Sequence, residues 1–141
     1  MKRYMLTVLV GLMVITSCKK EKLNENEASN QKLQGKWLVT NLKSTTLQNG
    51  KVVENEEKPD GKMIFEFSGN RLNLTEGNNV IGNYSYVIEA NEIVLREDGS
   101  EAVFFKYNFD SDTQLSLKQS ETVTQNNITY EESQTYVLTK M

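Results

Sequence analysis

Two glutamates are the residues of this chain best placed for acid–base chemistry. Asn126-Asn127 is typical of a tight turn, and a hairpin through it sets Glu121 opposite Glu132. The same register sets Gln119 opposite Gln134 on that face. Paired carboxylates raise one another's pKa, as in general acid–base catalysts. We favour the alternative that the hairpin extends past the fold into water, which screens the repulsion, or that a bulge turns one glutamate outward. In a binding protein, these carboxylates would be polar groups at the mouth of a cup.

The chain has few other residues that could catalyse a reaction. The chain has no histidine and one cysteine, Cys18, which excludes Ser-His-Asp triads, histidine bases and zinc sites built on Cys or His. No glycine-rich phosphate loop is present. The acidic turns Asp110-Ser111-Asp112 and Glu97-Asp98-Gly99 do not match the pattern of a calcium loop. We therefore expect a protein that is not an enzyme and holds no metal or cofactor.

Aromatic side chains are the candidates for lining a ligand-binding interior. The same residues could fill a plain core, and for Trp37 we favour that interpretation because a buried indole dominates the packing around it. Several members are tyrosines, and buried hydroxyls need partners, which favours a cavity or a wet lumen. The candidates are Trp37, Phe65, Phe67, Tyr84, Tyr86, Phe105, Tyr107 and Tyr136.

The elements that would position these side chains are predicted by an internal recurrence. Phe65-x-Phe67, Tyr86-x-Ile88 and Tyr107-x-Phe109 stand 21 residues apart, and each precedes a turn and a second apolar pair. A two-residue turn at Gly69-Asn70 sets Phe67 opposite Leu72. The second and third hairpins keep the same apolar face, so together they predict an antiparallel meander.

The full set of expected strands closes this meander. Asn49-Gly50 could add a small hairpin, and residues 47–60 are otherwise expected as a loop. Such a meander usually removes its free edges by closing into a barrel, so we predict an all-β, eight-stranded antiparallel up-and-down barrel. The expected strands lie near residues 36–45, 62–68, 71–76, 81–89, 92–97, 101–110, 114–125 and 128–140.

The N-terminal segment predicts secretion. Lys2 and Arg3 precede an apolar run that ends in the small residues before Cys18, the order of a secretory signal over residues 1–17. Ile15-Thr16-Ser17-Cys18 resembles the lipobox of bacterial lipoproteins, in which the cysteine becomes a diacylated N-terminus. That resemblance implies lipidation of Cys18 and a location in the cell envelope. Lys19 stands where an inner-membrane retention signal typically has aspartate, which favours the outer membrane, on its periplasmic face or at the cell surface.

The charged stretch that follows is expected to be a tether. Residues 18–32 are polar and lack periodicity, which indicates a flexible segment, although their Glu, Lys, Gln and Ala content also allows a short helix. The barrel domain would then occupy residues 33–141. Loss of Lys2 and Arg3 with the signal leaves 14 basic against 19 acidic residues. This acidic balance argues against nucleic acid as a partner.

The barrel region resembles a known family. Gly35-Lys36-Trp37 is similar to the Gly-x-Trp motif of lipocalins, and the motifs after it follow the order found in the small lipocalin-like domains of bacterial lipoproteins. The resemblance covers residues 33–140 and implies a cup for an apolar molecule, closed at one end by a basic side chain packed on the motif tryptophan; Lys140 occupies the comparable place. The later motifs are Phe65-Glu66-Phe67, Gly82-Asn83-Tyr84, Ile93-Val94-Leu95 and Leu115-Ser116-Leu117.

Two functions from different classes remain open. The first is a lipid-anchored barrel that binds a small apolar or amphipathic molecule in its lumen through apolar burial. The second is a ligandless barrel whose loop at residues 47–60 contacts another envelope protein. The interior discriminates between them: an enclosed cavity of at least about 300 Å³ would support ligand binding, and a lumen filled by the aromatic side chains would support the interaction protein.

Overall fold

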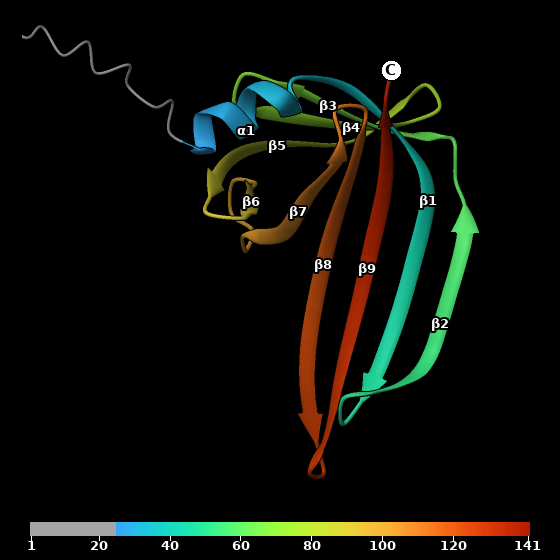
Figure 1. Ribbon diagram of the computed structural model, residues 1–141. Helices are drawn as coiled ribbons and strands as arrows, with labels where there is room; N and C mark the ends of the chain where they lie inside the picture. The colour runs from blue at the N-terminus through green and yellow to red at the C-terminus, as the bar shows by residue number, and fades with distance from the viewer. Residues whose placement is uncertain (1–24) are drawn as a thin grey trace, which may run out of the picture.

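The structure, a computed structural model, describes residues 25–141 (Figure 1). The expected signal at residues 1–17 and the lipidation site Cys18 lie outside the described residues. One short helix precedes nine strands along the chain. The elements are α1 (Glu25–Leu33), β1 (Gly35–Gln48), β2 (Lys51–Pro59), β3 (Met63–Ser68), β4 (Arg71–Glu76), β5 (Asn79–Glu89), β6 (Glu92–Arg96), β7 (Val103–Ser111), β8 (Gln114–Gln125) and β9 (Ile128–Lys140).

The predicted barrel is confirmed. Strands β3 to β9 pair in sequence order, and β9 returns to β1, which also pairs with β3. All pairings are antiparallel, so eight strands close an up-and-down, lipocalin-like barrel and β2 is an additional strand. Closure satisfies the backbone of both outer strands of the meander, which would otherwise be exposed edges.

The predicted registers are confirmed in all three central hairpins. Phe67 pairs with Leu72 in the first, and Ile88 pairs with Ile93 in the second. In the third, Phe109 pairs with Leu115, and a bulge before Ser111 takes up the extra turn residue. The apolar face is therefore kept from hairpin to hairpin.

Strand β2 confirms the possible hairpin through Asn49-Gly50, in which Leu47 pairs with Val52, and corrects the loop expected over the rest of residues 47–60. It pairs along β1 from Gln48↔Lys51 to Asn41↔Pro59, on the same edge of β1 as β3, which pairs only with residues 35–38. All nine of its residues are exposed, so its sequence carries no alternation of apolar and polar residues. The turn before it has Asn49 and Gly50 at φ 48° and 77°, as a tight two-residue hairpin requires.

Helix α1 takes up residues 25–32 of the segment expected as a tether, which agrees with the alternative of a short helix. The helix is polar, but its last residue, Leu33, has no exposed surface and belongs to the barrel core. The carbonyl oxygen of Leu33 accepts a hydrogen bond from Trp37 Nε1 at 2.7 Å. The helix forms because this apolar anchor docks it, whereas propensity alone does not stabilise so short a helix.

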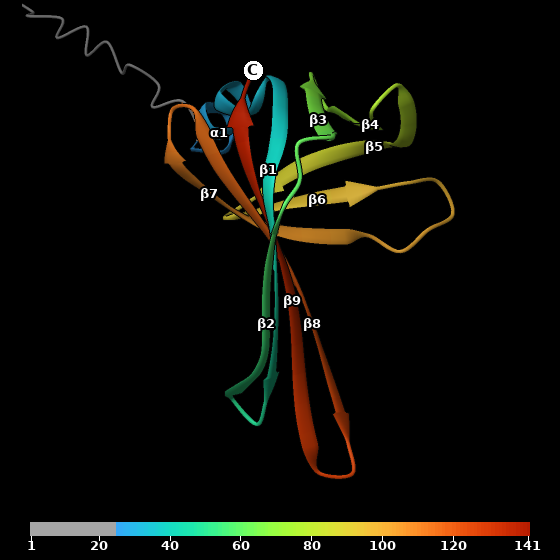
Figure 2. The ribbon, with the colours of Figure 1, turned by 90° about the vertical axis from the view of Figure 1, so that its right-hand side faces the viewer.

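Strands of unequal length divide the molecule into two parts. Figures 1 and 2 show β1, β2, β8 and β9 running together well beyond the shorter strands of the barrel. The ladder between β8 and β9 continues to Gln125↔Ile128, and residues 118–127 are all exposed. We call these four strands, from Asn41 on β1 and Lys118 on β8 onward, the extension. The core lies in the shorter, closed part.

Asp60 joins β2 to β3 and gives a test by pH. Its Oδ2 accepts the backbone N–H of Met63 and Lys62 at 3.0 and 3.2 Å. Burial alone would raise the pKa of Asp60, but the backbone N–H groups of Met63, Lys62 and Gly61 outweigh it and hold the pKa below the ordinary 3.8. Because its pKa is lower in the folded state, ionised Asp60 stabilises the fold at pH values above the unfolded-state pKa. This stabilisation is lost as the pH falls through the folded-state pKa.

We therefore expect Asp60→Ala to lower the free energy of unfolding by about 1 kcal/mol at neutral pH. The difference from the parent chain should shrink as the pH falls below 3.8 and through the lowered folded-state pKa of Asp60, which denaturant titrations across pH would measure. Asp98→Ala, in the exposed turn after β6, is the matched control and should change little. A deficit for Asp60→Ala that persists unchanged at pH 2 would contradict the role of the carboxylate.

Candidate functional site

The closed end of the barrel is built around Trp37. Its indole has no exposed surface, and the ammonium of Lys140 lies 5.1 Å from the ring centroid. Lys140 Nζ also donates to the carbonyl oxygen of Lys32 at 3.2 Å, so strand β9 is linked to helix α1 at this point. Lys140 therefore packs on the indole ring at this end of the barrel. The tryptophan is a core anchor, as expected.

The aromatic candidates come together in one cluster and pack on one another. Trp37, Phe65, Phe67, Tyr86 and Phe105 are at most 7% exposed, whereas Tyr84, Tyr107 and Tyr136 are half-buried at its margin. A side chain without exposed surface has no adjoining space that a water molecule could enter. The rings contact each other in the pairs Phe67–Tyr86, Phe65–Tyr136, Phe105–Tyr136, Tyr107–Phe109 and Trp37–Phe109 at centroid distances of 5.3, 5.6, 6.0, 5.8 and 6.4 Å.

The hydroxyls of Tyr86, Tyr107 and Tyr136 have protein partners, so these three do not need a wet lumen to satisfy them. Tyr86 Oη donates to Asn30 Oδ1 at 2.5 Å and accepts from Gln34 Nε2 at 3.0 Å. Gln34 Oε1 in turn accepts the N–H of Gly69, so α1 and the β3–β4 turn are joined through this tyrosine. Burial raises the pKa of Tyr86, although the hydrogen bond from Gln34 acts in the opposite direction. The Tyr86 hydroxyl therefore serves as a hydrogen-bond donor that holds α1 against the barrel.

Tyr136 marks the boundary between the core and the open mouth of the barrel. Its ring contacts Phe65 and Phe105, and its hydroxyl donates to Gln134 Oε1 at 3.2 Å. Burial raises the pKa of Tyr136, so the phenol stays protonated at neutral pH. The ring thus presents an apolar floor with one polar atom directed toward the mouth.

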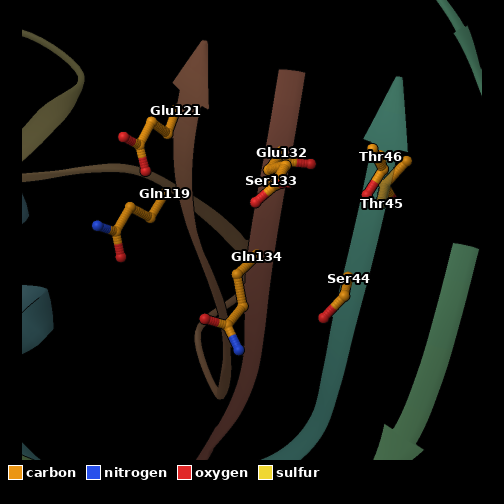
Figure 3. A pocket seen from close by; sticks show the side chains of 8 residues that line it. All are labelled: Ser44, Thr45, Thr46, Gln119, Glu121, Glu132, Ser133 and Gln134. Carbon is orange, nitrogen blue, oxygen red and sulfur yellow. The ribbon is translucent and has the colours of Figure 1, made fainter. Parts of the chain in front are cut away.

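A polar pocket lies in the extension, next to this floor. Its volume is about 320 Å³, and Figure 3 shows side chains from three strands lining it. Gln134 and Glu132 come from β9, one and two alternations beyond Tyr136. The lining consists of Ser44, Thr45, Thr46, Gln119, Glu121, Glu132, Ser133 and Gln134. We call it the mouth pocket.

Serine and threonine of β1 reach this pocket because of a bulge that the sequence did not reveal. The pairing of β1 with β9 skips a residue between Val39 and Asn41, after which Ser44 faces Gln134 and Thr46 faces Glu132. Uninterrupted alternation from Trp37 and Val39 would have turned the odd-numbered residues inward instead. The sequence analysis therefore missed Ser44 and Thr46.

The glutamate pair lies as the hairpin register predicts. Glu121 pairs directly with Glu132, and Gln119 with Gln134. Both glutamates are exposed, so water screens their repulsion and the favoured interpretation, a hairpin extending past the barrel into solvent, is confirmed. Their negative charges lie side by side, an arrangement that suits attraction of a positively charged group.

Two further hollows lie elsewhere on the barrel surface. One of about 250 Å³ lies between α1 and the β3–β4 turn and includes Asn30, Gly69 and Tyr86. Another, of about 560 Å³, lies over the exposed β5–β6 turn and includes the candidate Tyr107. The remaining candidate, Tyr84, packs over Gly82, whose missing Cβ leaves room for the ring. These hollows lack the convergent side chains from three strands that define the mouth pocket.

Within residues 25–141, no three acidic side chains come together in a way that could hold a metal ion. The helix found in that range is not long and apolar enough to cross a membrane.

Comparison with known proteins gives no match. No family model, no curated protein and no solved structure matches this chain. The architecture and the geometry of the mouth pocket are therefore the basis for the proposed function.

Proposed function

We propose that this protein is a non-catalytic binding protein of the cell envelope, which holds a small amphipathic molecule at the mouth of its lipocalin-like barrel. The observation that carries the proposal is the mouth pocket beside the Tyr136 ring. Its volume of about 320 Å³ lies in the range of small-molecule sites, about 300–1,000 Å³. The packed aromatic cluster argues against a ligand deeper in the barrel.

The chemistry of the pocket favours an amphipathic ligand over a purely apolar one. Tyr136 does not line the pocket, but it is half-buried and its hydroxyl donates to the lining residue Gln134. An apolar tail that reaches past Gln134 would contact this ring, where burial contributes about 25 cal/mol per Å². Gln134, Gln119 and the β1 hydroxyls offer hydrogen bonds, and Glu121 with Glu132 attracts positive charge. A ligand with a short apolar tail and a cationic or hydrogen-bonding head fits this order.

The proposed anchor is a lipidated Cys18 following removal of residues 1–17. Residues 18–24 connect the proposed lipid anchor at Cys18 to helix α1, which begins at Glu25. They span at most about 25 Å when fully extended. Because α1 lies at the closed end of the barrel (Figure 1), this anchor would hold the closed end toward the membrane and leave the mouth farther away. The outer membrane is the proposed location.

Native mass spectrometry of the full chain tests the ligand proposal. With added dodecyltrimethylammonium, we expect a one-to-one complex that is at least ten-fold more abundant than with dodecyl sulfate, which has the same tail. Ser44→Phe places a ring in the mouth pocket and should reduce the complex at least ten-fold. The control Lys43→Phe lies on the other face of β1 and should not.

Equal reduction by both variants, or equal binding of the two amphiphiles, would contradict the proposal.

A second candidate function, an interaction module, is favoured by a different observation. Exposed strands of the extension have backbone edges that no neighbouring strand covers among residues 25–141.

A further inference from the structure

The far half of β8 has a free backbone edge. On one side, β8 pairs with β9 from Gln114 to Gln125. On the other side, its pairing with β7 ends at Lys106↔Lys118. Within the described residues, 119–125 of β8 therefore have a strand neighbour on one side only. A free edge of this kind is a template for an added strand.

The β8–β9 turn determines which backbone groups face this edge. Asn126 and Asn127 have φ of 53° and 62°, as in a two-residue hairpin turn, so the flanking pair Gln125↔Ile128 exchanges hydrogen bonds within the hairpin. Hydrogen-bonded and non-bonded pairs alternate along an antiparallel ladder. The N–H and C=O groups of Ser120, Thr122 and Thr124 therefore point to the free edge.

The two free edges of the extension differ in how they are protected against pairing. Strand β2, at the other side of the extension, carries charges at five of nine positions and ends in Pro59. Such charges and prolines discourage strand addition. Residues 119–125 of β8 read Gln-Ser-Glu-Thr-Val-Thr-Gln, with one charge and no proline. Their threonines and valine favour a strand, so this edge is open to pairing.

A small pocket beside the same edge fits one kind of side chain. It has a volume of about 100 Å³ and is lined by Glu121, Val123, Tyr130 and Glu132. Val123 and Tyr130 offer apolar walls for a methylene stem, and the two carboxylates offer a place for a cationic head. Lysine and arginine combine these features, since their stems pack on apolar surface while the charge stays hydrated.

We propose that residues 119–125 of β8 bind an extended segment of a partner protein by strand addition, with a lysine or arginine of that segment in the small pocket. Main-chain hydrogen bonds to Ser120, Thr122 and Thr124 would supply affinity, and the pocket would supply specificity. The small pocket shares Glu121 and Glu132 with the mouth pocket. The inference goes beyond the proposed small-molecule function because it uses the backbone edge of β8, which that function does not need, and does not use Ser44.

A synthetic peptide tests the proposal on the full chain. The probe is a nine-residue peptide of alternating threonine and valine with lysine at its centre, and its match carries glutamate there. Fluorescence anisotropy should show the lysine peptide binding at least ten-fold more tightly. Thr122→Pro removes an N–H from the free edge and should weaken binding at least ten-fold, whereas Thr122→Val keeps the N–H and should not.

A second variant and a second probe keep the test independent of folding. Glu132→Gln should reduce the preference for the lysine peptide at least five-fold while leaving the edge intact. A lysine peptide N-methylated on alternate residues along one side should lose binding to the unaltered chain, because it cannot pair through that side. Ser44→Phe should leave peptide binding unchanged, and Thr122→Pro should leave amphiphile binding unchanged, so the two sites fail separately.

Three results would overturn the inference. The first is equal binding of the lysine and glutamate peptides. The second is unaltered binding by both Thr122→Pro and the N-methylated peptide. The third is concentration-dependent dimerisation of the chain that Thr122→Pro abolishes, without peptide binding, which would assign the edge to a second copy of this chain.

Discussion

Replacing Trp37 with alanine is expected to lower the free energy of unfolding by about 4 kcal/mol, because a large buried aromatic leaves a cavity that the closed barrel cannot collapse. Trp37 has no exposed surface and contacts the Phe109 ring and the Lys140 ammonium. Its Nε1 also satisfies the buried carbonyl oxygen of Leu33. Denaturant unfolding followed by circular dichroism measures the change.

Trp37→Phe separates packing from the hydrogen bond. It keeps most of the apolar volume and leaves the Leu33 carbonyl oxygen without its donor, so we expect a loss of about 2 kcal/mol, between the parent and the alanine variant. An alanine variant within 1 kcal/mol of the parent would show that Trp37 borders a cavity able to adapt. That result would reopen the lumen of the closed part as a ligand site.

Leu33→Ala is expected to cost about 3 kcal/mol. Leu33 is the buried residue of α1 and has no exposed surface, while the rest of the helix is polar and faces water to varying degrees. Because a short polar helix is not stable alone, removal of this anchor should release α1 from the barrel as well as open a cavity. Hydrogen exchange of the α1 amides should become faster than that of β8 and β9.

Gln31→Ala is the control within the same helix, since Gln31 is exposed and alanine has the higher helix propensity. Its free energy of unfolding should stay within about 0.5 kcal/mol of the parent. If Leu33→Ala destabilised the chain no more than Gln31→Ala, the helix would be an appendage and residues 25–33 would belong with the tether. The structure instead makes α1 the seal of the closed end.

The sites proposed above all lie at the end of the molecule opposite the packed, closed end. The mouth pocket, the paired carboxylates and the free edge of β8 all belong to the extension, which Figures 1 and 2 show reaching away from α1. The closed part then acts as the rigid support for side chains from β1, β8 and β9. This division explains why the aromatic residues with the strongest sequence signal are packing residues.

The hairpins of the barrel were predictable because their information is local. Each strand pair is joined by a short turn of glycine, asparagine, aspartate or serine, and period-two alternation fixes which residues share a face. The opposition of Phe67 and Leu72, and that of Glu121 and Glu132, follow from the turn residues between them. The glutamate half of the mouth pocket could therefore be located from sequence.

The side of the mouth pocket that β1 supplies could not be located from sequence, because it depends on contacts between segments far apart in the chain. The pairing of β1 with β9 closes the barrel, and the skipped residue at Thr40 turns Ser44 and Thr46 toward the pocket. A bulge of one residue inverts every following side chain, and no local pattern marks its position. The highly charged β2 likewise becomes a strand by pairing its backbone with β1, which alternation does not report.

By itself, the sequence determined the all-β class, the eight strands and the hairpin registers, because these depend on alternation and on turn residues close in the chain. Only the tertiary structure decided the docking of α1 through Leu33, the added strand β2 and the packed state of the aromatic interior. A barrel with a filled core and a barrel with a cavity show the same pattern of apolar residues in the sequence. Whether space remains between them depends on how side chains from all eight strands fill the closed barrel.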